Sequence, residues 1–127
     1  MSKVIPLDMT KLTKEPFVNL TVEILHSAMT DWQRAHITIK QLGGEEVAHK
    51  QWLENIELLH NEPNKYFNNK IERQIKKYIR STRVIVEIEG FIQSKWFDEL
   101  CCCIDLDPEA VVKEFSDIKK RIYNNEV

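Results

Sequence analysis

The sequence predicts an all-α protein, a compact bundle of about five helices that forms a single domain over residues 1–127. Apolar residues recur at helical spacing along most of the chain. Only three glycines and four prolines interrupt it, which also favours helices. Hydrophobic residues make up 43% of the chain and charged residues 30%, a balance typical of globular domains rather than of disordered segments. Residues 1–16, where Pro6 and Pro16 interrupt any helix, are expected to form an extended lead-in.

Two amphipathic helices are expected next, separated by a pair of glycines. The first covers residues 18–42, where one apolar position recurs every seven residues. That position is occupied by Val18, Leu25, Trp32 and Ile39. Gly43 and Gly44 follow, at the point where a helix favours a left-handed cap. The second helix covers residues 45–60, and its apolar face consists of Ala48, Trp52, Ile56 and Leu59.

A long third helix is expected to begin at Asn64 or Lys65 and to continue to Gln93. Its apolar side is formed by Ile71, Ile75, Tyr78, Thr82 and Ile85. Glu89 then interrupts the apolar spacing, so one acid is expected on an otherwise apolar face. Gly90 predicts either a kink or a close packing contact near the end of this helix.

The last third of the chain predicts a hairpin of two helices that is similar in length to a helix-turn-helix. Ser94 is the expected cap of a helix over residues 95–104, and Asp107 caps a final helix that begins with Pro108. Asp105 stands in the turn where glycine is preferred, although aspartate tolerates the left-handed region better than most residues. The final helix has an apolar face of Val111, Val112, Phe115, Ile118 and Ile122. Such a hairpin either reads a DNA groove or packs the carboxyl end onto the bundle.

The basic residues of the third helix gather on one side, opposite its apolar side. This basic face consists of Lys70, Arg73, Lys76, Lys77, Arg80 and Arg83. A face of this kind is typical of phosphate contacts, so it is the candidate nucleic-acid site, with Lys95 and Lys113 as secondary contacts. The alternative is that the face pairs with the acidic segment before it, which carries Glu45, Glu46, Glu54, Glu57 and Glu62. The formal net charge of −2 differs from that of a generic nucleic-acid binder, and both interpretations stay open.

Three aromatic residues near the end of the third helix form a candidate protein-contact patch. Trp96 and Phe97 are consecutive, so their side chains point about 100° apart on a helix and one of them can project away from the core. Phe91 lies just upstream and can join the projecting ring. The alternative is a short helix that is buried on both sides and exposes neither ring.

No segment predicts an enzyme, a cofactor or a metal site. The chain has no Gly-rich phosphate loop and no recognisable catalytic frame of carboxylates or histidines. The three cysteines, Cys101 to Cys103, are consecutive, which suits neither a disulfide nor a zinc site, and they are expected to fill a buried helix as small hydrophobes. No apolar run is long enough to span a membrane and no secretory signal begins the chain, so a cytoplasmic location is expected.

Three stretches of the sequence resemble one group of proteins. The first is Ala28-x-x-Asp31-Trp32-x-x-Ala35. The second begins Glu87-Ile-Glu89-Gly-Phe91 and continues through Ser94, Trp96, Phe97 and Leu100, and the third is Leu106-Asp-Pro-Glu-Ala-Val111. Together they resemble small helical proteins encoded in bacteriophage and prophage genomes, with residues 43–70 as an insertion. The resemblance implies a phage origin and a location in a bacterial host cell, but no catalytic residue.

The leading hypothesis is therefore a non-enzymatic phage-type regulator that binds nucleic acid through the basic face of the third helix. The alternative is an interaction protein that binds and inhibits a host protein. It would use the same basic face or the patch of Phe91, Trp96 and Phe97. The long amphipathic first helix is also compatible with a homodimer.

Overall fold

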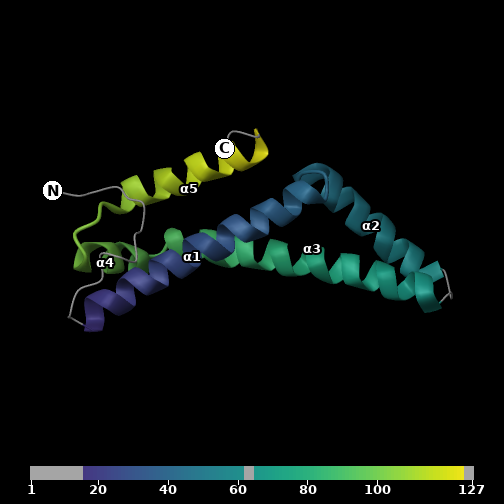
Figure 1. Cartoon of the computed structure of the whole chain (residues 1–127), viewed down its shortest axis with the longest axis horizontal. Coiled ribbons are helices and arrows are strands. Elements are labelled where there is room, and N and C mark those ends of the chain that lie inside the picture. The colour runs from purple at the N-terminus through teal and green to yellow at the C-terminus, as the bar shows by residue number, and fades with distance from the viewer. Residues whose placement is uncertain (1–15, 62–64, 125–127) are drawn as a thin grey trace.

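The structure is a computed structural model, and it describes residues 16–61 and 65–124. These residues form five α-helices and no strand (Figure 1), which confirms the all-α class. The helices are α1 (Pro16–Gln41), α2 (Glu45–Asn61), α3 (Lys65–Ile92), α4 (Lys95–Cys103) and α5 (Pro108–Tyr123). The expected lead-in lies outside the described residues, except that Pro16 already belongs to α1.

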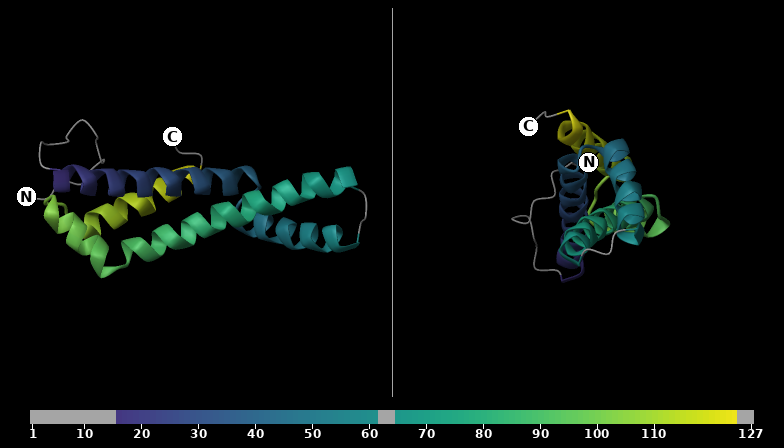
Figure 2. Two further views of the ribbon diagram at one scale, coloured as in Figure 1. Left: turned by 90° about the horizontal axis from the view of Figure 1, so that it is seen from below. Right: turned by 90° about the vertical axis from the view of Figure 1, so that its right-hand side faces the viewer.

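The two long helices α1 and α3 pack side by side, and the shorter helices extend this pair at opposite ends. At one end, α2 folds back from α1 and packs on the first half of α3, and these two helices project beyond the rest (Figure 2). At the other end, α4 contacts α1 and α3, and α5 returns along α1. We call α2 with the part of α3 that packs beside it, as far as Val86, the arm, and the remaining helices with the end of α3 the body.

The main hydrophobic core lies in the body, where helices far apart in sequence meet around Trp32. Its ring makes an edge-to-face contact with Phe115 of α5 at a centroid distance of 5.0 Å. The core cluster brings together residues of α1, α3, α4 and α5, namely Leu25, Met29, Trp32, Ile92, Phe97, Cys101, Val111, Phe115 and Ile118. The carboxyl-terminal hairpin is therefore an integral part of the core.

The helix ends follow the caps that the sequence predicts. Gly43 and Gly44 both adopt positive φ angles, of 108° and 99°, between α1 and α2. The Ser94 hydroxyl accepts a hydrogen bond from the backbone N–H of the third residue of α4, and the Asp107 carboxylate accepts one from the second residue of α5. Asp105 has a φ of 56°, so it takes the left-handed position where glycine is preferred.

The structure excludes one of the two alternatives for Gly90 and shows that the expectation for the cysteines is wrong. Gly90 is exposed, and a β-carbon added there would meet no atom within 4 Å apart from its own stretch of helix, so the close packing contact is excluded and the kink stays a prediction. Only Cys101 is buried, whereas Cys102 and Cys103 are exposed. The reason is that α4 lies at the edge of the body, so only one side of this short helix faces the core.

Candidate functional site

The basic face of α3 is exposed over its whole length. The side chains of all six of its residues, from Lys70 to Arg83, are exposed to solvent. On the apolar side of the same helix, the ring of Tyr78 stacks on Trp52 of α2 at a centroid distance of 5.4 Å. None of the six cations forms an ion pair within the described part of the chain. The pairing with the acidic segment that the sequence left open is thus absent for residues 45–61, where Glu54 and Glu57 are exposed as well. The fifth acid of that segment, Glu62, lies outside the described residues.

The two secondary basic residues lie apart from this face. Lys95 is the first residue of α4, and Lys113 lies in the second turn of α5; both are exposed. The two helices that carry them belong to the body, whereas the basic face begins in the arm (Figure 1). The structure therefore brings the six α3 cations together but does not gather Lys95 and Lys113 with them.

The α4–α5 hairpin uses its apolar residues for packing. Val111, Phe115 and Ile118 of α5 are buried in the core, and the turn joins the two helices through the left-handed Asp105. On the outer side of the first turns of α5, Glu109 and Lys113 are exposed. This outer side thus carries mixed charge, which does not favour contact with a phosphate backbone.

The orientation of α4 places one of the three aromatic residues of the expected protein-contact patch in the core and leaves the other two at the surface. Phe97 has an exposed fraction of 0% and belongs to the core, so it is not available as a contact residue, contrary to the set expected from the sequence. Trp96 is 54% exposed, and its ring meets that of half-buried Phe91 edge-on at a centroid distance of 5.4 Å. The interpretation of α4 as a helix buried on both sides is therefore wrong.

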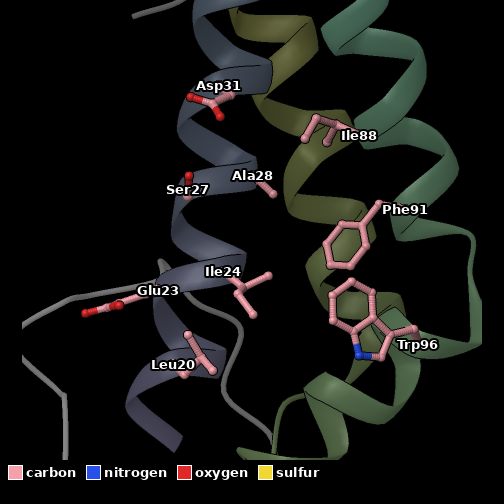
Figure 3. A pocket seen from close by; sticks show the side chains of 9 residues that line it. All are labelled: Leu20, Glu23, Ile24, Ser27, Ala28, Asp31, Ile88, Phe91 and Trp96. Atoms are coloured by element: carbon pink, nitrogen blue, oxygen red, sulfur yellow. The ribbon is translucent and has the colours of Figure 1, made fainter. Parts of the chain in front are cut away.

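Phe91 and Trp96 form one wall of a shallow groove of about 430 Å³ between α1, α3 and α4. Ile24 and Ala28 of α1 point toward the two rings from the opposite wall (Figure 3). The carboxylates of Glu23 and Asp31 border the groove but point away from the rings. The groove thus offers an apolar surface beside two acids, which suits an apolar side chain of a partner protein.

A polar cluster around a buried histidine in the body was not anticipated from the sequence. His36 has an exposed fraction of 0%, and its Nδ1 shares a hydrogen bond of 2.7 Å with the Tyr123 hydroxyl. Burial raises the pKa of Tyr123 to about 12, so the phenol keeps its proton. The other ring nitrogen, Nε2, lies 3.8 Å from Oε2 of Glu89, too far for a hydrogen bond, and has no hydrogen-bond partner among the described residues. That Oε2 accepts a hydrogen bond from Trp32 Nε1 at 3.4 Å.

The Glu89–His36–Tyr123 cluster explains the acid that interrupts the apolar spacing of α3. Burial, together with the nearby Lys119 cation, lowers the pKa of His36 below its ordinary value of 6.5. The signal in the sequence was Glu89 itself, an acid that interrupts the apolar spacing of this helix. The cluster joins α1, α3 and α5, and with Tyr123 holding its proton it offers no activated nucleophile.

Two classes of site receive no support from the described residues. No group of three or more His, Cys, Asp or Glu side chains lies close enough to hold a metal ion there. None of the helices described has the combination of length and apolar character that a membrane crossing needs.

Comparisons of the chain with protein-family models, with curated proteins and with solved structures gave no significant match.

Proposed function

We propose that this protein is a non-enzymatic regulator that binds nucleic acid through the basic face of α3. The observation that carries the proposal is the exposure of six cations on one helical face, with no ion pair to any residue that the structure describes. Unpaired, solvated cations are available to replace the counterions of phosphates, whereas internally paired ones are not. The resemblance of three stretches of the sequence to phage-encoded proteins supports a role in the regulation of phage genes.

The proposed contact is with the phosphate backbone. The thirteen steps from Lys70 to Arg83 cover roughly 20 Å of helix, enough to follow several successive phosphates. The α4–α5 hairpin offers no basic groove-reading face, since Glu109 accompanies Lys113 on its outer side. Binding is therefore expected to depend steeply on salt and weakly on sequence.

Charge reversal on the basic face tests this proposal. Arg73→Glu with Lys77→Glu changes two exposed residues that are four positions apart on α3. The affinity for a labelled random-sequence duplex, measured by fluorescence anisotropy, is expected to fall by at least about tenfold at low salt, because two phosphate contacts become repulsive. The slope of log affinity against log salt should lose about two units, one for each contact removed.

The matched control is Lys120→Glu with Arg121→Glu, which makes the same change in net charge at two exposed positions of α5. It is expected to retain most of the affinity and the full salt slope. Equal losses in the two double variants would mean that only net charge matters. No binding by the wild-type protein at low salt would refute the proposal outright.

A second function, binding to a host protein, is favoured by the groove beside Trp96. An indole that is 54% exposed and rests against Phe91 resembles the aromatic anchors on which protein interfaces depend. In a pull-down from bacterial lysate, a true partner is expected to be retained by the wild-type protein and lost, at least about tenfold, by Trp96→Ala. Val112→Ala, an exposed apolar residue of α5, is the control and should retain it. If all three proteins retain the same set, the groove is not a binding site.

A further inference from the structure

The groove beside Trp96, which we call the Trp96 groove, has an apolar wall and a polar edge on the same helix. The α1 residues that line it form two rows, and within each row the members are four residues apart. The apolar row consists of Leu20, Ile24 and Ala28. The polar row consists of Glu23, Ser27 and Asp31. Ile24 and Ala28 point toward the aromatic rings, whereas the polar row lies on the side of α1 turned away from them (Figure 3).

The charge on the polar edge is negative and is not neutralised by the described residues. Glu23 and Asp31 are both exposed, and neither forms an ion pair with any residue that the structure describes. Two cations are close in sequence to the groove, since Lys95 precedes Trp96 and Arg34 is three residues after Asp31. Neither cation is among the described residues that line the groove. The lining therefore attracts cations and repels phosphates.

The length of the edge indicates the form of its ligand. The eleven steps from Leu20 to Asp31 cover roughly 16 Å, which is three turns of a helix and far longer than one side chain. The two carboxylates are eight steps apart, roughly 12 Å along the axis of α1. Two cations eight positions apart on another helix have the same separation, because both helices share one rise per residue. A helix that lies along α1 can therefore meet both acids at once.

We propose that the Trp96 groove binds a cationic amphipathic helix of another protein. An apolar side chain of that helix packs between Trp96 and Ile24, as in other complexes in which a helix lies in an apolar groove. Its Lys or Arg side chains extend over the edge of α1 and pair with Glu23 and Asp31. The proposal rests on the second function given above, binding to a host protein, and names the chemistry of the partner. It is independent of the basic face of α3.

A comparison of two peptide selections tests this chemistry without a known partner. An mRNA-displayed library of random 16-residue peptides is selected on the full-length wild-type protein and, in parallel, on Trp96→Ala. Acidic peptides that bind the basic face of α3 should appear in both selections. Peptides found only with the wild type are the groove ligands, and they are expected to carry apolar residues three or four positions apart beside Lys or Arg. Circular dichroism checks that the variant keeps its helices.

A charge exchange then tests the two carboxylates. The strongest groove peptide, measured by fluorescence anisotropy, is expected to bind Glu23→Lys with Asp31→Lys at least about tenfold more weakly, because two attractions become repulsions. Replacing the lysines and arginines of that peptide by glutamate should restore binding to this double variant. Glu54→Lys with Glu57→Lys is the matched control, since it makes the same change in net charge at two exposed positions of α2. It should retain the original affinity.

Four results would overturn the inference. Groove peptides that are acidic or uncharged would leave binding to a host protein in place but refute the cationic partner. Equal losses in the two double variants would show that only net charge matters. A wild-type mass in sedimentation equilibrium that is double that of Trp96→Ala would make a second copy of the chain the occupant of the groove. The absence of any peptide specific to the wild type would refute both the inference and the host-protein function on which it rests.

Discussion

At the scale of single residues, the neutral imidazole of His36 couples the stability of this protein to pH. Its pKa is lowered by burial and by Lys119, against the opposing effects of Glu89 and Glu45. The unfolded chain therefore binds a proton more readily than the folded one below pH 6.5. The stabilisation from His36 is fully present above that pH and is lost as the pH falls through the lowered pKa.

The His36→Gln variant tests this coupling. The free energy of unfolding of the wild-type protein, measured with urea, should fall relative to the variant by up to about 1.4 kcal/mol per pH unit below pH 6.5. His60→Gln removes an exposed histidine of α2 and should leave the wild-type profile unchanged. Parallel profiles for the wild type and His36→Gln would show that the imidazole titrates alike in both states.

The contacts of His36 could not be predicted from the sequence. Glu89 was recognisable as an acid at an apolar position of α3, but its partners were not. Trp32 and His36 are 57 and 53 residues away along the chain, and Tyr123 lies on the last helix. Which histidine turns inward depends on how α1, α3 and α5 pack together, and helical periodicity within one segment carries no such information.

At the scale of helices, the boundaries were predictable because local chemistry sets them. Ser94 and Asp107 satisfy backbone N–H groups that every helix start leaves unpaired, and Gly43 supplies a positive φ. The position of the basic face on α3 was also predictable, because it needs only helical spacing. The absence of ion pairs between this face and residues 45–61 was not predictable, because it depends on how α2 is rotated about its own axis.

The orientation of the short helix α4 could not be predicted from the sequence either. Its two consecutive rings had to point in different directions, but the sequence offered no means to decide which ring enters the core. In the structure Phe97 fills the core, whereas Trp96 rests on Phe91 at the surface. The choice is made by α5, which returns Val111 and Phe115 to the side of α4 that carries Phe97.

At the scale of the whole molecule, the body and the arm are expected to differ in local stability. The core cluster draws its buried residues from the body, whereas only Ala48 and Asn55 are buried within α2. Segments with few buried apolar contacts open more easily, so their amide hydrogens exchange faster. In dilute solution, the amides of α2 should therefore exchange at least about tenfold faster than those in the centre of α1 around Trp32.

Hydrogen exchange followed residue by residue along the chain tests this difference between the arm and the body. The residues of α1 that surround Trp32 pack against α3, α4 and α5, so their amides open only when the body itself opens. The residues of α2 pack mainly on α3, so their amides can open while the body stays folded. Equal exchange rates in α2 and in the centre of α1 would show instead that the arm and the body open as one cooperative unit.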